Sequence, residues 1–251
     1  MKLGAERLGV GPPVVLVHGW ALGAGLLRPW AEALVSQGRS AILVELPGHG
    51  DTPDATFTAP ELGAELAQRV GEPAWWVGWS LGGQICLEAL MAGAPARGAL
   101  LVAATPRFSA GVDWPCGVDP AELAALRRTL DREPAAAVAA FLALLARAGD
   151  AERRAVRGLR GSLSEAPGPR GLASGLACLA GADYRDGLAA VAAPLLWLAG
   201  ERDPLVPPEA ARSAAACSPA GTCQVLPQAG HLPFVTHPAR VAAALESLEA
   251  A

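Results

Sequence analysis

Short apolar runs alternate with amphipathic segments over the first part of the chain. Uninterrupted apolar runs are typical of strands in a parallel sheet, because helices cover both faces of such a sheet. The pattern predicts strands at residues 14–18, 41–46, 74–79 and 99–103, with helices at 26–36, 60–70 and 80–91. Regular alternation of this kind favours an α/β fold with a mostly parallel central sheet flanked by helices.

The strand pattern stops after residue 106 and returns after residue 183. The intervening sequence predicts only helices, at residues 120–130, 134–148, 150–159 and 171–179. Strands then follow at 195–199 and 223–226, with helices at 208–216 and 238–248. We therefore expect one α/β core in two parts, residues 1–106 and 184–251, interrupted by a helical insertion at residues 107–183 that we call the lid.

Composition excludes several classes of protein. The 251 residues carry 24 acidic and 20 basic side chains, and 52% of them are hydrophobic, which does not fit a disordered chain. The basic residues form no block, so we expect no nucleic-acid partner. No apolar stretch reaches the length of about 18 residues that a membrane span needs. Five cysteines without a C-x-x-C pair indicate neither a disulfide framework nor a zinc site, and they favour a reducing, cytoplasmic location. We expect a monomer.

The motif with the clearest chemistry is Gly78-Trp79-Ser80-Leu81-Gly82, which matches G-x-S-x-G between a predicted strand and a predicted helix. In this setting the serine stands on a tight turn that exposes its hydroxyl at the edge of the sheet. Small residues are required on both sides of it because the backbone is crowded there. We interpret Ser80 as a nucleophile.

A serine nucleophile needs a histidine base, which in this topology comes last in the chain. His231 and His237 are the candidates. His231 follows the last predicted strand in a loop, and the glycine before it lets the ring turn into the site. His237 precedes a proline at a helix start, where a capping role is more typical. The pattern favours His231.

The acid that orients the histidine should follow a late strand. Asp203 stands in a loop directly after the strand at 195–199, and Pro204 rigidifies the turn. Glu201 is two residues away, and we expect it to face solvent instead. The predicted catalytic residues are therefore Ser80, Asp203 and His231, a set that hydrolyses carboxylic esters.

Backbone N–H groups complete such a site by binding the oxyanion. The N–H of Leu81 at the helix start and the N–H of Trp20, which follows the turn at Gly19, are the expected donors. No G-x-G-x-x-G motif follows a strand, and no phosphate-binding loop is present. We therefore expect no cofactor and no metal, since a triad and an oxyanion hole suffice for acyl transfer.

Taken in order, these motifs resemble those of the α/β-hydrolase family. The matching segments are residues 17–20, 46–50, 78–83, 200–203 and 230–231. Within that family the chain is most similar to the esterases of biotin synthesis that act on the methyl ester of pimeloyl-acyl-carrier protein. That narrower resemblance rests on residues 16–20, 78–80, 108–110, 114–115, 141–144 and 234–239.

The resemblance implies that a pimeloyl methyl ester is hydrolysed while it is attached to acyl-carrier protein. It implies that Trp20 and Leu81 contact the ester and that the Phe141, Leu142 and Leu144 side chains bind the acyl chain. It also implies that basic lid residues dock the acidic carrier. The candidates are Arg147, Arg153, Arg154, Arg157 and Arg160. Alanines at positions 136, 137, 139 and 140, where further basic residues are expected, depart from that pattern.

Other interpretations stay open at this point. The same triad serves broad-specificity short-chain carboxylesterases and thioesterases that act on small esters. A non-catalytic receptor on the same fold is a more remote alternative, because all three triad members are present. The arginines are also compatible with an ordinary solvated helix face.

Overall fold

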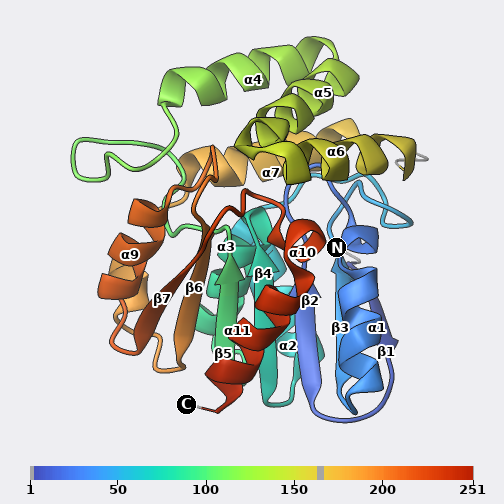
Figure 1. Ribbon diagram of the computed structural model, residues 1–251, viewed down its shortest axis with the longest axis vertical. Helices are drawn as coiled ribbons and strands as arrows, with labels where there is room; N and C mark the ends of the chain where they lie inside the picture. Colours follow the sequence, from blue (N-terminus) through green and yellow to red (C-terminus); the bar gives the residue numbers. More distant parts are fainter. Residues whose placement is uncertain (1–2, 163–166, 251) are drawn as a thin grey trace.

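The computed structural model describes residues 3–162 and 167–250, without the side chains of residues 160–162. Within these residues, seven strands form one sheet in the order β1-β3-β2-β4-β5-β6-β7 (Figure 1). The strands are β1 (Gly4–Leu8), β2 (Pro13–Val17), β3 (Ser40–Glu45), β4 (Ala74–Trp79), β5 (Ala96–Val102), β6 (Leu195–Gly200) and β7 (Gly221–Leu226). All pairs are parallel except β1 with β3. The predicted mostly parallel α/β sheet is confirmed.

Helices flank this sheet on both faces (Figure 1). In the orientation of Figure 1, α1 (Arg28–Ser36) and α11 (Pro238–Glu249) lie in front of the strands, and α2 (Ala59–Val70) and α3 (Leu81–Met91) lie behind them. Helix α9 (Pro208–Ala216) packs against β6 and β7. The remaining short helices of the core are η1 (Ala24–Leu26), α8 (Arg185–Leu188) and α10 (Pro233–Thr236).

Strand β1 is the element that the sequence pattern missed. Its sequence Gly4-Ala5-Glu6-Arg7-Leu8 contains no apolar run, and its three central side chains are exposed. Successive residues of a strand point to opposite faces, so both faces of β1 are exposed at its centre, and the strand pairs through its backbone without an apolar run. The prediction missed β1 because it relied on burial of both faces.

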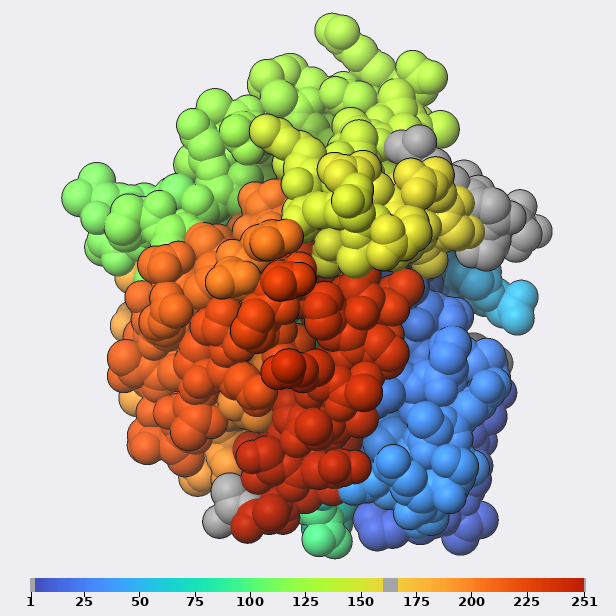
Figure 2. Space-filling model, in the orientation of Figure 1, coloured from blue at the N-terminus to red at the C-terminus, as the bar shows by residue number. Residues whose placement is uncertain are grey.

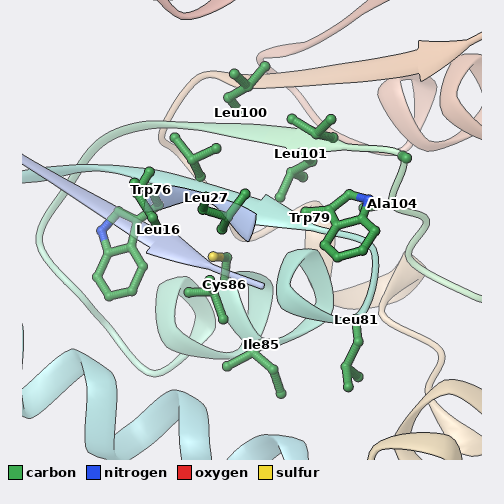
Figure 3. Close-up of a cluster of buried hydrophobic side chains, with 14 of the residues drawn as sticks. Leu16, Leu27, Trp76, Trp79, Leu81, Ile85, Cys86, Leu100, Leu101 and Ala104 are labelled. Carbon is green, nitrogen blue, oxygen red and sulfur yellow. The ribbon is translucent and has the colours of Figure 1, made fainter. Parts of the chain in front are cut away.

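The core under the active site consists of side chains from β2, β4, β5 and α3 (Figure 3). Cys86 points from α3 toward the strands, and Ile85 points away from them. Both are fully buried, because α2 packs against the far side of α3. A helix that is apolar all round is stable only when it is enclosed in this way. The rigid enclosure fixes the start of α3, where Ser80 stands.

The lid covers the carboxyl ends of the parallel strands (Figure 1). Its helices are α4 (Pro120–Arg132), α5 (Pro134–Leu145), η2 (Ala146–Ala148), α6 (Asp150–Ser162) and α7 (Pro169–Gly181). Figure 2 shows these segments, green to yellow, as a layer above the orange, red and blue surface of the core. The division into core and lid at residues 106–107 and 183–184 stays a prediction. None of the helices in the described part of the chain is long and apolar enough to cross a membrane.

Candidate active site

Ser80 stands on a strained turn between β4 and α3. Its φ of 54° and ψ of −118° are unusual for a residue other than glycine. A Cβ built on Gly82 would lie 2.1 Å from the carbonyl oxygen of Val17, so no larger residue fits there. This crowding is the physical reason for glycine two positions after the serine. The turn brings the hydroxyl of Ser80 to the carboxyl edge of the sheet.

The structure brings Ser80, His231 and Asp203 together at that edge. His231 Nε2 is 3.0 Å from Ser80 Oγ, and its Nδ1 is 2.7 Å from Asp203 Oδ2. With the imidazole proton on Nδ1, the histidine donates to the carboxylate and accepts from the hydroxyl. All three side chains are buried. Such an arrangement is able to deprotonate the serine hydroxyl during attack on a carbonyl carbon.

Asp203 is fixed by its own loop. Its Oδ1 accepts hydrogen bonds from the backbone N–H groups of Leu205 at 2.8 Å and Val206 at 3.1 Å. The second oxygen therefore has one orientation, toward His231. Glu201, the alternative acid, instead accepts a hydrogen bond from the N–H of Gln228 at 2.8 Å.

His231 is held from the core side by Trp79. The indole Nε1 of Trp79 donates to the carbonyl oxygen of His231 at 2.8 Å, and the two ring centroids are 5.7 Å apart. His237, the alternative base, precedes α11, and its Nδ1 lies 2.8 Å from Thr236 Oγ1. Among the described residues Ser80 Oγ is hydrogen-bonded to His231 and not to His237, so His237 lies outside the hydrogen-bonded set.

Trp20 and Leu81 flank the serine. Leu81 follows Ser80 directly in the sequence. A Cβ built on Gly19 would lie 3.1 Å from Ser80 Cβ, so the backbone just before Trp20 is in close contact with Ser80. The lid packs onto both residues. A Cβ on Gly175 of α7 would lie 2.9 Å from side-chain atoms of each, and the Trp20 indole donates to the carbonyl of Leu172 at 2.8 Å.

A cluster of His18, Glu45 and His49 supports the loop that carries Trp20. His18 Nδ1 donates to the carbonyl of Gly19 at 2.8 Å, and its Nε2 lies 3.1 Å from Glu45 Oε1. Burial is the largest single influence on Glu45 and opposes its ionisation, but the nearby His18 and the N–H of Ala24 together outweigh burial, so the pKa of Glu45 lies below its usual value. Burial, with the nearby His18 as a second cause, lowers the pKa of His49 to about 4. His49 is therefore neutral near pH 7 and serves the loop structure.

An apolar cavity of about 150 Å³ lies between the lid and the core. Trp20 and Leu205 line it from the core, and Phe141 and Leu144 line it from α5. The ring of Phe141 meets that of Trp20 edge-on, with centroids 5.1 Å apart. Phe108 and Leu179 line both this cavity and the narrow crevice beside Ser80, so the two spaces adjoin. A more open groove of about 500 Å³ beside β1 includes none of the three triad residues.

Two of the predicted acyl-binding residues do not line that cavity. Leu142 is buried but faces elsewhere, because successive residues of a helix are rotated by about 100° and only Phe141 and Leu144 share a face of α5. Leu81 packs under α7 instead of lining the cavity. Leu81 remains next to the serine through its backbone.

The predicted docking arginines lie on η2 and α6. Arg147, Arg153, Arg154 and Arg157 are exposed, and Arg153 forms an ion pair with Asp150. The side chain of Arg160 lies outside the described residues. Among the residues that the structure describes, no three His, Cys, Asp or Glu side chains form a group that could hold a metal ion.

One buried polar residue of the site escaped the sequence analysis. Glu152 of α6 is fully buried and binds the loop of His231. The prediction singled out only the arginines of this segment and passed over the acid among them. Its spacing of four from Ala148 and from Val156, both buried, was the signal that it belongs to the inner face of the helix.

Comparison with known proteins identifies the class. A family model described as "Alpha/beta hydrolase family" matches residues 14–244. The chain belongs to the α/β hydrolase family. Solved structures agree with this fold: an esterase from Exiguobacterium antarcticum has a TM-score of 0.89 at 22% identity and covers 100% of this chain and 96% of its own. A bromoperoxidase from Bacillus anthracis has a TM-score of 0.88 at 20% identity, covering 99% and 95%.

More similar sequences carry one name. A protein of Stenotrophomonas maltophilia (strain K279a) called "Pimeloyl-[acyl-carrier protein] methyl ester esterase" is 40% identical over 97% of this chain and 95% of its own length. A protein of the same name from Xanthomonas campestris pv. campestris (strain B100) is 38% identical over 98% of both chains. The expected resemblance to these esterases is confirmed.

Proposed function

We propose that this chain is a serine carboxylesterase that hydrolyses the methyl ester of pimeloyl-acyl-carrier protein in biotin synthesis. The observation that carries the proposal is the hydrogen-bonded series Ser80–His231–Asp203, which adjoins an apolar cavity between the lid and the core. The series supplies the chemistry of ester hydrolysis, and the apolar cavity suits a methylene chain. The name shared by relatives of nearly full coverage supports the substrate.

The reaction proceeds in two acyl transfers. Ser80 Oγ attacks the ester carbonyl carbon while His231 Nε2 takes the hydroxyl proton. The N–H groups of Trp20 and Leu81 donate to the oxyanion of the tetrahedral intermediate. The intermediate collapses as His231 returns the proton to the leaving oxygen, and methanol departs. Water then gives a proton to His231 and attacks the acyl-enzyme, which releases the pimeloyl carboxylate and restores Ser80. Asp203 stabilises the imidazolium throughout.

The lid binds the rest of the substrate. Phe141 and Leu144 contact the acyl chain in the cavity. The exposed arginines at 147, 153, 154 and 157 attract an acidic carrier protein, and clustered charges of one sign raise the rate of encounter with the opposite sign. A carrier-bound substrate also implies a cytoplasmic enzyme, which the five free cysteines support. We further propose that it acts as a monomer.

The test is a reaction of the purified protein with methyl-pimeloyl-acyl-carrier protein. We expect release of methanol and loss of one methylene unit from the mass of the acylated carrier, with no product from a Ser80→Ala variant. Release of carrier without its acyl chain would instead identify a thioesterase. Hydrolysis of small free esters alone would favour the broad-specificity esterase, which the alanines at 136, 137, 139 and 140 also favour. Growth of a biotin auxotroph lacking its esterase checks the same proposal in cells.

A further inference from the structure

Glu152 is an unusual buried acid in the lid. It has 0% exposure and stands in the first turn of α6. Carboxylates are almost never fully buried unless they are paired or hydrogen-bonded. The partial positive charge at the start of a helix favours an anion at this position. Among the described residues its Oε2 has no hydrogen-bond partner, so the contacts of Oε1 account for its role.

Those contacts reach both ends of the segment that carries His231. Glu152 Oε1 accepts a hydrogen bond from the backbone N–H of Gly230 at 2.6 Å, and it lies 3.4 Å from Thr236 Oγ1, whose hydroxyl also donates to the carbonyl of Leu232 at 3.0 Å. Gly230 directly precedes His231, and Thr236 is the last residue of α10. Figure 2 shows the yellow segment of the lid directly above the red C-terminal segment on this face. One lid oxygen therefore bridges the residues on either side of the base.

The contact leaves little freedom to the backbone at His231. A Cβ built on Gly230 would lie 2.4 Å from Ala148 Cβ and 2.8 Å from Glu152 Oε1, so the loop and the lid touch at van der Waals distance. From the opposite side Trp79 donates to the carbonyl of His231 at 2.8 Å. The core thus holds the peptide that follows the His231 Cα, and the lid holds the Ala229–Gly230 peptide, one residue before the peptide that enters His231.

We infer that Glu152 is a positioning residue for His231, an inference that rests on the proposed role of His231 as the base. The carboxylate fixes the Ala229–Gly230 peptide, and through Gly230 it limits where His231 can stand and thereby the distance from Nε2 to Ser80 Oγ. A hydrogen bond to an ionised acceptor is stronger than one to a neutral acceptor, which suits a contact that must hold through both acyl transfers. Without it, the buried N–H of Gly230 must find another partner, and the loop shifts.

The test separates positioning from lid stability. We expect Glu152→Ala to lower kcat for p-nitrophenyl acetate by about 10- to 100-fold, the loss that a small misplacement of a reacting group causes. KM should stay within about twofold of wild type, because the cavity is unchanged. Labelling of Ser80 by a fluorophosphonate should slow by the same factor as kcat. Glu152→Gln keeps a carbonyl acceptor toward Gly230 and should restore kcat to within about threefold of wild type.

Ser174→Ala is the matched control. Ser174 Oγ accepts a hydrogen bond from the N–H of Phe57 at 3.1 Å, which is also a buried lid-to-core bond but lies away from the His231 loop. Ser174→Ala should lower the midpoint temperature of thermal unfolding, as Glu152→Ala does, but it should retain the wild-type kcat. If Glu152→Ala does not fold, Glu152→Asp, which draws the oxygens back by one methylene, should show the same loss of kcat.

Three results would overturn the inference. The first is labelling of Ser80 at the wild-type rate in both Glu152→Ala and Glu152→Asp. The second is a loss of kcat in Ser174→Ala equal to that in Glu152→Ala, and the third is a kcat of Glu152→Gln as low as that of Glu152→Ala. Absence of labelling at Ser80 in the wild-type protein would overturn the proposed function itself, and the inference with it. Normal wild-type labelling with unaffected Glu152 variants would overturn the inference alone.

Discussion

The carboxyl edge of the sheet and the lid contribute to one site by different means. Ser80, Asp203 and His231 stand on turns after β4, β6 and β7, so parallel strands in fixed register bring them together. The lid contributes side chains from helices whose packing against one another decides the shape of the cavity. The comparison teaches that the chemistry is encoded in short local motifs, whereas substrate selection depends on contacts between distant helices.

The two regions are joined by a few specific hydrogen bonds. Besides Glu152, Asp54 in the loop after β3 accepts from the N–H of Gly171 at 2.8 Å, at the start of α7. The Trp20 indole donates to Leu172 in the next position. These bonds fix α7 over Trp20 and Leu81, the proposed oxyanion donors. We therefore expect triad variants to abolish turnover on every ester and lid variants to alter it selectively.

Replacement of the nucleophile should have the largest effect. Ser80→Ala removes the attacking oxygen, and loss of a triad serine costs about six orders of magnitude in kcat. The measurement is kcat on both p-nitrophenyl acetate and the carrier-bound ester, which should fall together. Ser218→Ala, at another buried serine distant from the site, is the control and should be active. A Ser80→Ala enzyme with a tenth of wild-type turnover would refute the assignment.

Asp203→Asn should follow, with a loss of roughly four orders of magnitude. Two backbone N–H groups bind Asp203 Oδ1, so asparagine must direct its carbonyl to them and its NH₂ toward His231 Nδ1. That contact favours the tautomer with the proton on Nε2, which cannot accept from Ser80. Steady-state kinetics on a small ester measure the loss. Glu201→Gln serves as the control, and an equal defect there would argue against the assignment of Asp203.

The sequence predicted the triad turns and the helices of the lid, but not which lid side chains face the site, for a physical reason. The crowding at Gly78-Trp79-Ser80 and the turns after late strands impose residue types that can be recognised locally. Which of Phe141, Leu142 and Leu144 faces the cavity depends on how α5 packs against α4 and α6, which no local pattern records. The burial of Glu152 could be inferred from its helical spacing, but its partner Gly230, 78 positions away, could not.

Phe141→Ala should separate long from short substrates. The side chain lines the cavity, and a substrate that loses about 1.4 kcal/mol of apolar contact binds tenfold more weakly. We expect kcat/KM for long-chain methyl esters to fall by about tenfold, while p-nitrophenyl acetate is hydrolysed at close to the wild-type rate. Leu145→Ala, at a fully buried position of the same helix outside the cavity lining, is the control. Equal losses on both esters would assign Phe141 a purely structural role.

Charge reversal on α6 should give the smallest effect and the most selective one. Arg153, Arg154 and Arg157 are exposed, and each exposed ion pair contributes roughly 0.2–1 kcal/mol. The triple change to glutamate should lower kcat/KM for the carrier-bound ester by about 3- to 30-fold at low salt, mainly through slower encounter. The difference from wild type should shrink as salt is raised, because screening weakens the attraction in the wild-type enzyme. A small free ester needs no docking surface, so its hydrolysis should be unaffected.

The matched control reverses the charges of Arg127, Arg128 and Arg132, which are exposed on α4. A selective loss of activity on the carrier-bound ester in the α4 variant instead would place the docking surface on α4. A loss on both the carrier-bound and the free ester in the α6 variant would show that the α6 arginines stabilise the lid.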